Sequence, residues 1–513
     1  MISRISGIVL AFYLIEKVLF RITSLPFDSY SSTFIYWEFL KKIGSTIYIP
    51  ILCILLVIIY AKHVVIPWKS FEKGNQIRLF LTAIGLILTW IFSTYNYNYY
   101  FDQWHVYDRI LLCATALLIF YRPIFVVSFL SMLLPIIGQE EVIQLFSLAA
   151  PLLPIRLLIL FTVFLFARIV FKRFNYRDFV FMVSCLVGVH YFASGIRKVF
   201  TGFEWILYNK INYLVPSMYG NGWFSWASPE FISSATAFLE YFNFPLKVFT
   251  LSIEIGVLFM FINLKWARYC LIGAIIMHMG IVVYSGIFFW LWSLILILVL
   301  YFFLNEKAVE NSILFTKKYF VVAFFLIGMG QFWSRPIPLS WLDTPLNYTH
   351  KFFAETANGN VVQLTPKFFS PYVFQFTTGK FKYLNNEPRL PILWGATNVQ
   401  TSSFLRVPQS EESISNFESE NGKIYYNEKS KSSFIDFVQR FVSNWNESYP
   451  GENYMDYIQP PRMLLTFPTD LFSDGKDEIV KVKVIETTTL YSKEKGFREI
   501  RNKELLEINI PIE

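Results

Sequence analysis

The stretch VSCLVGVHYFASGIRK, residues 183–198, is apolar almost throughout and ends in the basic pair Arg197 and Lys198. A run of this length and character is typical of a helix that crosses a membrane. His190 lies inside the run, and Lys198 lies where the helix should leave the hydrocarbon. Most lysines in such a place extend to the interface, but an amine beside hydrocarbon is costly to keep protonated and can serve as a base. Lys198 is therefore a candidate functional residue, with simple extension to the interface as the alternative.

The whole chain has the composition of a membrane protein. Hydrophobic residues make up 55% of its 513 residues and charged residues only 16%, whereas soluble domains carry about a quarter charged residues. The net charge of +8 does not indicate a nucleic-acid partner, because no basic stripe or nucleic-acid motif accompanies it. The four cysteines fall in or at the end of apolar segments without metal-binding spacing, so we expect them to pack inertly.

Further apolar stretches follow the same pattern over the first two thirds of the chain. We expect a polytopic α-helical membrane protein with about nine to eleven transmembrane helices, near 5–20, 46–61, 79–95, 110–121, 123–137, 154–171, 179–196, 247–263, 269–285, 287–304 and 319–333. Arg122 and Pro123 split the pair at 110–137, which is either two tilted helices or one kinked helix. Glu16 and Lys17 interrupt the first stretch and no small-residue cleavage site follows, so we interpret it as a retained helix.

Basic residues mark one side of these expected helices. Four loops carry them, and their members are Lys62, Lys69, Lys73, Arg78, Lys172, Arg173, Arg177, Lys265, Arg268, Lys307, Lys317 and Lys318. With about eleven spans, these loops fall on one side, which the positive-inside rule makes cytoplasmic. Arg21, Lys41 and Lys42 in the first outer loop are the main exception. We therefore expect a multi-pass protein of the cytoplasmic (inner) membrane with its N-terminus inside and residues 334–513 outside.

Residues 334–513 differ in character from residues 1–333, so we divide the chain into two domains there. Alternation of polar and β-branched residues, as in VKVKVIETTTLY at 480–491, predicts strands, and SSFIDFVQRFVSNW at 432–445 predicts an amphipathic helix. We expect a mainly β extracytoplasmic domain in which the acidic stretch SEESISNFESE at 410–420 is a solvated loop. The outer loop at 200–245, rich in Trp, Tyr and Gly, is expected to form interfacial helices.

Ionisable side chains inside the expected spans are few, and each is a candidate functional residue because hydrocarbon disfavours charge by on the order of several kcal/mol. Within the spans lie Glu16, His190, Glu254 and His278, while His105 precedes a span on the outer side. We expect Glu254, His278, His105 and Lys198 to converge on one cavity that opens outward. The alternative is that each completes a separate hydrogen bond between helices.

Three blocks of sequence carry a family resemblance. They are YFASGIRKVFTGFEW at 191–205, HMGIVVYSGIFFWLWSLIL at 278–296 and, more weakly, DQWHVYDRILL at 102–112. They resemble the Y-F-x-A-G-x-K-K-L-x-x-x-W signature, the H-x(8)-G-x-F-x-x-x-M/L helix pair and the W-x-x-H-x-Y-L-Y helix start of vitamin K-dependent γ-carboxylase and its bacterial relatives, the horizontally transferred transmembrane (HTTM) proteins. The resemblance in sequence covers roughly residues 1–340. An outward β-rich tail is also similar to the family's architecture, but the tail carries no motif that matches the family.

The resemblance implies roles for individual residues. The family's catalytic base falls on Lys198; in the carboxylase this lysine deprotonates reduced vitamin K, whose reaction with oxygen generates a base that takes a γ-proton from a glutamate before carbon dioxide adds. The active-site histidine falls on His105, a supporting histidine on His278 and a membrane carboxylate on Glu254. We group His190 and Arg197 with Glu254 as cofactor-binding candidates. The implied cofactor is reduced vitamin K or menaquinol, and the implied partners are membrane lipid and an exported protein or peptide substrate.

Two departures from the family pattern bear on the function that the resemblance implies. Arg197 stands where the family has the first of two lysines, and an arginine cannot act as a base in a protein. The family's W-T-x-x-G-x-x-F-S-W stretch after the last helix is replaced by SWLDTPLNYTHKFFAETANG at 340–359. These differences favour a quinol-using core over glutamate carboxylation. The alternative function is a non-enzymatic membrane scaffold, immunity or export factor, and no inverted repeat or broken-helix pair favours a transporter.

The orientation can be tested by labelling. Single cysteines introduced at Ser413 and at Lys69 should differ in their reaction with a membrane-impermeant thiol reagent on intact cells. We expect labelling at position 413 only, because the positive-inside rule places the loop with Lys69 in the cytoplasm. Labelling of position 69 from outside would contradict the orientation.

Overall fold

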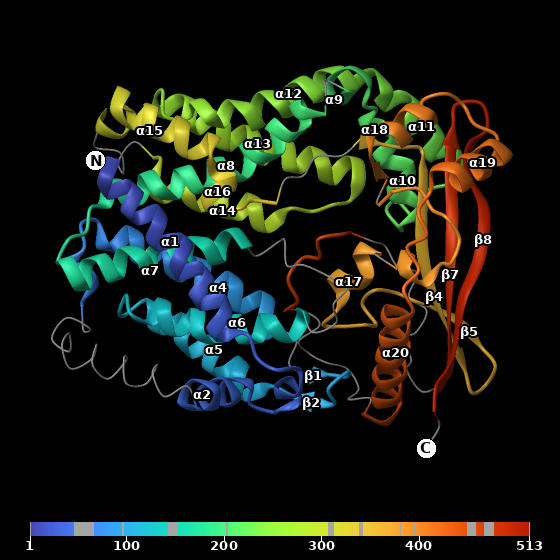
Figure 1. Cartoon of the computed structure of the whole chain (residues 1–513), viewed down its shortest axis with the longest axis horizontal. Helices are drawn as coiled ribbons and strands as arrows, with labels where there is room; N and C mark the ends of the chain where they lie inside the picture. The colour runs from blue at the N-terminus through green and yellow to red at the C-terminus, as the bar shows by residue number, and fades with distance from the viewer. Residues whose placement is uncertain are drawn as a thin grey trace.

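The computed structural model describes most of the chain, namely residues 2–45, 66–94, 97–141, 152–201, 204–305, 312–337, 342–379, 381–393, 395–448, 458–465 and 477–511. The span expected at 46–61 lies outside these residues. Up to Trp333 the described chain is almost entirely helical, and the strands of the main sheet all follow it (Figure 1).

The helices of the first region are α1 (Ile2–Thr23), α2 (Ile35–Ser45), α4 (Gly74–Ser93), α5 (Val106–Ile119), α6 (Phe125–Glu141), α7 (Leu152–Phe171), α8 (Tyr176–Phe200), α9 (Glu204–Tyr208), α10 (Leu214–Gly220), α11 (Pro229–Leu239), α12 (Asn243–Gly256), α13 (Leu264–Ser285), α14 (Trp290–Phe303), α15 (Lys317–Gly328) and α16 (Gly330–Trp333). Within the described residues, five helical runs are long and apolar enough to cross a membrane: Gly74–Ser93, Leu152–Phe171, Tyr176–Phe200, Pro229–Phe259 and Leu264–Ser285. The chain is therefore mostly helical, with the kind of helices that a membrane protein needs.

Two expectations about the helices are resolved by the fold. The segment at 110–137 forms two separate helices, α5 and α6, and the chain leaves helical geometry at Arg122 and Pro123. The loop at 200–245 does form helices, but α11 continues through the 3-10 turn η4 (Glu240–Phe242) into α12. The span expected at 247–263 thus belongs to a longer helical run, Pro229–Phe259.

Helix α8 lies at the centre of the helical region and contacts α7, α12, α15 and α16. Asn175 caps its N-terminus by accepting from the backbone N–H groups of Arg177 and Asp178. From Phe179 to Gly195 its residues are buried on all sides, as expected for a helix that is apolar all round. Glycines permit the close packing: a Cβ at Gly188 would lie 2.9 Å from Ile327 Cδ1 of α15.

The C-terminal region contains a four-stranded antiparallel sheet in the order β5-β4-β7-β8. Its elements are β3 (Leu342–Asp343), β4 (Leu346–Thr356), β5 (Val361–Leu364), α17 (Val373–Thr378), β6 (Ala396–Thr397), α18 (Val399–Leu405), α19 (Glu411–Asn421), α20 (Glu428–Ser448), β7 (Ile479–Ser492) and β8 (Gly496–Asn509). The strand predicted at 480–491 is confirmed as β7, and the amphipathic helix predicted at 432–445 is confirmed within α20.

The tail contains the expected sheet, and it contains more helix than we expected. Helix α20 alone has 21 residues, and the acidic stretch expected as a loop is helix α19. Ser410 caps α19 by accepting a hydrogen bond from Ser413 N. The carboxylates of Glu411 and Glu412 in the first turn stabilise the helix, because they interact favourably with the positive end of its dipole. Because the stretch is so polar, its few buried contacts, such as Ile414, left no strong periodic signal.

The tail and the helical region share one hydrophobic cluster. Its members from the first 110 residues include Leu25, Tyr30, Ile35, Phe39, Tyr100 and Phe101, and they pack with Phe and Val side chains of β4, α17, α20 and β7. The Tyr100 ring lies 5.0 Å from the Phe437 ring, and Asn98 Nδ2 donates to Tyr372 Oη at 2.9 Å. In Figure 1, α20 accordingly lies beside the short hairpin of β1 (Tyr97–Asn98) and β2 (Gln103–Trp104). The sheet domain is thus packed onto the helices rather than tethered to them.

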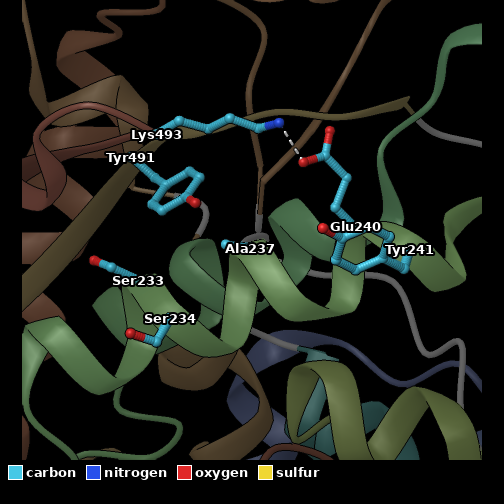
Figure 2. Close-up of a pocket in the computed structure, with 7 residues that line it drawn as sticks. All are labelled: Ser233, Ser234, Ala237, Glu240, Tyr241, Tyr491 and Lys493. Carbon is cyan, nitrogen blue, oxygen red and sulfur yellow. Dashed lines mark ion pairs between the residues drawn. The ribbon is translucent and has the colours of Figure 1, made fainter.

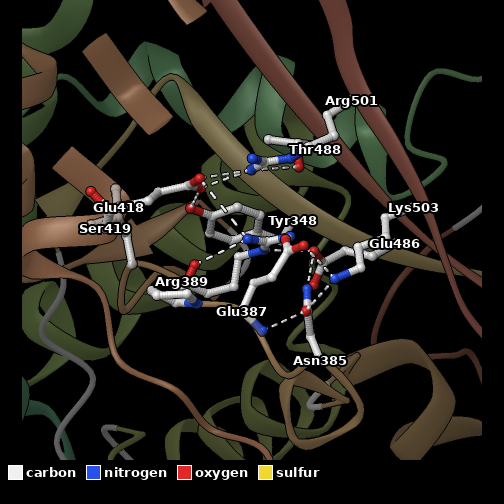
Figure 3. A network of polar contacts seen from close by, with 12 residues as sticks. Tyr348, Asn385, Glu387, Arg389, Glu418, Ser419, Glu486, Thr488, Arg501 and Lys503 are labelled. Carbon is white, nitrogen blue, oxygen red and sulfur yellow. Dashed lines mark hydrogen bonds and ion pairs between the residues drawn. The ribbon is translucent and has the colours of Figure 1, made fainter. Parts of the chain in front are cut away.

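A buried polar network holds one face of the tail sheet (Figure 3). Arg389 is 2% exposed, and its Nε donates to Glu486 Oε1 at 2.7 Å. Asn385 donates to the same oxygen at 2.8 Å, and Arg501 donates to Glu418 at 2.9 Å. Buried charges of this kind are tolerated only when they are paired and hydrogen-bonded.

His350 of β4 lies beside this network, opposite Glu486 of β7 in the sheet register. Its Nε2 is 3.6 Å from Glu486 Oε2, and its ring packs 5.6 Å from the Phe381 ring. Burial lowers the pKa of His350 to about 4, with Lys382 and Arg389 adding to the lowering and Glu486 opposing it. The native tail therefore holds His350 neutral.

This neutral histidine predicts an acid-sensitive tail. Because its folded pKa lies below the unfolded value of 6.5, the unfolded chain binds the proton more tightly, so stability falls as the pH is lowered from 6.5 through 4. The loss attributable to His350 should reach on the order of 3 kcal/mol. Thermal unfolding of wild type and His350→Gln, followed from about pH 7 to about pH 4, should show a shallower pH dependence in the variant. Identical profiles would contradict the assignment.

Candidate functional site

Lys198 and Glu254 form a buried ion pair between α8 and α12. Lys198 Nζ lies 2.6 Å from Glu254 Oε1 and 2.8 Å from Oε2, so the amine donates to both carboxylate oxygens. Lys198 is 6% exposed and Glu254 5% exposed. The Trp205 ring lies 5.4 Å from the ammonium nitrogen, which adds a cation–π contact. The lysine therefore does not extend into solvent, as most lysines at a helix end would.

Local packing explains why the pair forms. Lys198 lies in the last turn of α8, and Gly195 precedes it by about one turn on the side that faces α12. A Cβ at Gly195 would lie 2.8 Å from Glu254 Cβ, closer than side chains tolerate. The glycine therefore lets Glu254 approach α8 closely enough to reach the lysine.

A second polar pair lies on the same side of α8. Tyr191 Oη is 2.8 Å from His278 Nε2 of α13, and Tyr191 precedes Lys198 by seven residues, which is two helical turns or about 10 Å. The two pairs therefore lie on the same face of α8, about two turns apart. The Phe289 ring packs 5.1 Å from the His278 ring. Three of the residues expected to converge, Lys198, Glu254 and His278, are thus brought to neighbouring positions along α8.

His190 belongs to a different cluster. Its Nδ1 donates to the Leu186 carbonyl at 2.8 Å, and its Nε2 lies 3.4 Å from Arg156 Nη1 of α7. Arg156 Nε in turn lies 2.6 Å from Glu16 Oε1 of α1. Arg156 was not among the candidate residues expected from the sequence, because it stands near the edge of the apolar stretch at 154–171. An arginine just inside an expected span is the signal that could have identified it as a candidate.

Arg197 and His105 lie away from the Lys198 pair. Arg197 is exposed, because adjacent residues of a helix point about 100° apart. His105 is fully buried at the start of α5, and its Nε2 lies 2.7 Å from Gln139 Nε2 of α6. Burial, aided by Arg109, lowers the pKa of His105 to about 3, so the imidazole is neutral. The expected convergence of His105 with Lys198 is not seen, because its contacts are made with the helices on the N-terminal side of the bundle.

A segment of the tail covers the turn that carries Phe289. Met463 O accepts from Phe288 N at 2.6 Å, and Leu465 N donates to Gly286 O at 2.9 Å. Leu464 is buried in a small hydrophobic cluster with Trp223, Ile287 and Phe289. A strand-like segment of the C-terminal region therefore holds the turn between α13 and α14. This turn carries Phe289, whose ring packs against His278.

Comparison with known protein families, with curated proteins and with solved structures finds no match for this chain.

The fold and the site define a helical protein with helices of membrane-spanning length and two buried polar pairs on one side of its central helix. An amine and a carboxylate in direct contact can exchange a proton, and a tyrosine bonded to a histidine can do the same. The arrangement is therefore suited to acid–base chemistry on a molecule that reaches the interior of the bundle. Within the described residues, no group of three or more His, Cys, Asp or Glu side chains is placed to hold a metal ion.

The ion pair makes a stability prediction. Lys198→Met leaves Glu254 as an uncompensated buried carboxylate and should destabilise the protein by about 3–5 kcal/mol. The double variant Lys198→Met/Glu254→Met removes both charges and retains comparable packing, so its stability should be close to that of the wild type. Thermal unfolding of the purified proteins in detergent, followed by tryptophan fluorescence, measures both effects. Equal stability of the single and double variants would show that the pair is not buried.

Proposed function

We propose that this protein is an enzyme of the cytoplasmic membrane, related in architecture to the vitamin K-dependent γ-carboxylase and HTTM families. Its site would face outward and act on a lipid-soluble reactant, with Lys198 as the base. The N-terminus would lie in the cytoplasm and the sheet domain outside. The substrate to be modified would be an exported protein or peptide.

One observation carries this proposal, namely the contact between Lys198 and Glu254 beside Tyr191 and His278. A lysine that donates to both carboxylate oxygens carries its proton, so it cannot accept another in that state. Transfer of that proton to Glu254 would leave a neutral amine in an environment of low dielectric, where a neutral pair is less disfavoured than in water. Glu254 would therefore act as the acceptor that prepares Lys198 as a base.

Aromatic side chains surround His278, and this supports the proposal of a reduced quinone as the reactant. Phe289 and Tyr191 pack against the His278 ring at centroid distances of 5.1 and 5.7 Å, and Trp292 lies 6.2 Å from Tyr191. Aromatic walls with a few hydrogen-bonding groups are the usual lining of a site for a planar, lipid-soluble molecule. A reduced vitamin K or menaquinol bound there would supply an acidic hydroxyl group. Tyr191 and His278 would orient that hydroxyl toward the amine of Lys198.

A second function is favoured by a different observation. The Arg156–Glu16 pair, with side chains 6% and 11% exposed, links α7 to α1 in the same way that Lys198–Glu254 links α8 to α12. If both pairs only join helices, the helical region would be a scaffold, an immunity factor or an export factor that carries the sheet domain. Stability data alone do not separate the two functions, because both require the pair to be buried.

Substitutions at Lys198 separate catalysis from anchoring. Lys198→Arg keeps a positive charge beside Glu254 but cannot be deprotonated, so it should abolish function in the native host while the protein still accumulates in the membrane. Lys198→Ala should be equally inactive and partly rescued by small amines. Arg197→Lys is the matched control and should be nearly neutral, because Arg197 is exposed. Full function of Lys198→Arg would favour the anchor.

Lipid bound to the purified protein gives an independent test. Mass spectrometry of extracted lipid should detect a quinone that co-purifies with the wild-type protein. The amount should fall in His278→Leu, which removes the hydrogen-bonding group, and should remain unchanged in Arg197→Lys. Wild-type protein free of quinone in membranes that contain it would contradict the proposed reactant.

A further inference from the structure

A cavity of about 520 Å³ lies between α11 and the tip of the β7–β8 hairpin (Figure 2). One wall comes from the helix and the other from the hairpin, and the lining residues are Ser233, Ser234, Ala237, Glu240, Tyr241, Tyr491 and Lys493. Ser233 fixes the two walls together, because its Oγ accepts from Phe497 N at 3.0 Å and donates to Pro229 O at 2.7 Å. The cavity is thus built jointly by the helical region and the tail.

The lining of this cavity holds one carboxylate, Glu240, and one ammonium group, Lys493, and Lys210 outside the lining adds a second ammonium group. Glu240 Oε2 lies 2.6 Å from Lys493 Nζ, and Glu240 Oε1 accepts from Lys210 Nζ at 3.2 Å. Two ammonium groups therefore share one carboxylate, both of whose oxygens are engaged. An ammonium group has three donors, and the Lys493 side chain is 63% exposed, so it can bond a further anion. The group that complements this cavity is anionic.

An exposed apolar strip leads away from the cavity along the same helical run. It consists of Phe238, Tyr241, Phe244 and Val248, whose spacing of three and four residues places them on one face, and Tyr241, which also lines the cavity, is 83% exposed. Solvent-exposed aromatic clusters of this kind mark interaction sites. The run Pro229–Phe259 has 31 residues, so it is about 46 Å long, whereas the hydrocarbon core is about 30 Å thick. The outer turns therefore project beyond the hydrocarbon, and the strip connects them to the part that can lie within it.

We propose that this cavity binds the anionic phosphate head of a membrane phospholipid whose acyl chain lies along the strip toward the bilayer. Lys493 donates to the phosphate, Glu240 holds Lys493 in place, and the hydroxyl groups of Ser234 and Tyr491 face the head group. The aromatic side chains of Phe238 and Tyr241 cover the upper part of the acyl chain. This site is independent of the function proposed for Lys198.

The test measures lipid binding to the full-length protein in detergent by native mass spectrometry. The probes are phosphatidylglycerol, which is anionic, phosphatidylcholine, which has no net charge, and inorganic phosphate. Phosphatidylglycerol should bind, and Lys493→Ala should weaken its binding roughly tenfold, because a charge-assisted hydrogen bond is lost. Ala237→Trp, which fills the cavity without changing its charge, should weaken binding at least as much. Lys495→Ala is the matched control, because Lys495 is exposed on the same hairpin but does not line the cavity.

The outcomes distinguish the proposed lipid from its alternatives. Equal loss of binding in Lys495→Ala and Lys493→Ala would show a non-specific charge effect and overturn the site. Equal affinity for phosphatidylcholine would overturn the requirement for an anionic head. Inorganic phosphate that binds as tightly as the lipid, with the same sensitivity to Lys493→Ala, would overturn the membrane as the source. Wild-type thermal stability of Lys493→Ala, measured in parallel, excludes misfolding as the cause of lost binding.

Discussion

A buried ionisable side chain in an apolar bundle needs a partner, and the arrangement of helices around α8 follows from that requirement. Four polar side chains along α8 each meet a different helix: Asp178 meets Arg4 of α1, His190 meets Arg156 of α7, Tyr191 meets His278 of α13, and Lys198 meets Glu254 of α12. Apolar packing alone does not fix the rotation of a helix that is hydrophobic all round. These directional contacts do, because a rotated α8 would leave charges unpaired.

The same requirement extends to the tail. Its sheet buries Arg389, Glu486 and Glu418 in one network, and its aromatic side chains complete a cluster with the N-terminal segment around Tyr30 and Tyr100. The tail also contributes Leu464 to the turn beside Phe289. Movement of the sheet domain would therefore disturb the turn that positions the ring against His278. The tail belongs to the environment of the candidate site and is more than a soluble appendage.

Local patterns in the sequence predicted helices and strands. They could not predict which side chains of distant helices would contact one another. Apolar runs such as Gly74–Ser93 predicted helices because hydropathy is a property of neighbouring residues, and alternation predicted β7 for the same reason. The strand β8 is rich in charged residues, so its alternation was obscured. The candidate residues expected from the cost of burying charge included Lys198 and Glu254, which form an ion pair, and His278, which bonds Tyr191 on the same side of α8. Tyr191 itself and Arg156 were absent from that list, because a contact between distant helices has no local signature.

The Lys198–Glu254 pair differs from the two arginine pairs that link helices of the bundle in a way that bears on its role. The Arg4–Asp178 and Arg156–Glu16 pairs use arginine, whose guanidinium keeps its proton in proteins and whose planar shape suits fixed pairing. Lys198 is an amine that can give up its proton, and its carboxylate partner can accept it. A purely structural link would work with either residue, whereas proton exchange requires lysine. The Tyr191–His278 pair lies about two turns away on the same side of α8, so groups that can give and take a proton follow one face of a buried helix, and groups of this kind are what acid–base chemistry needs.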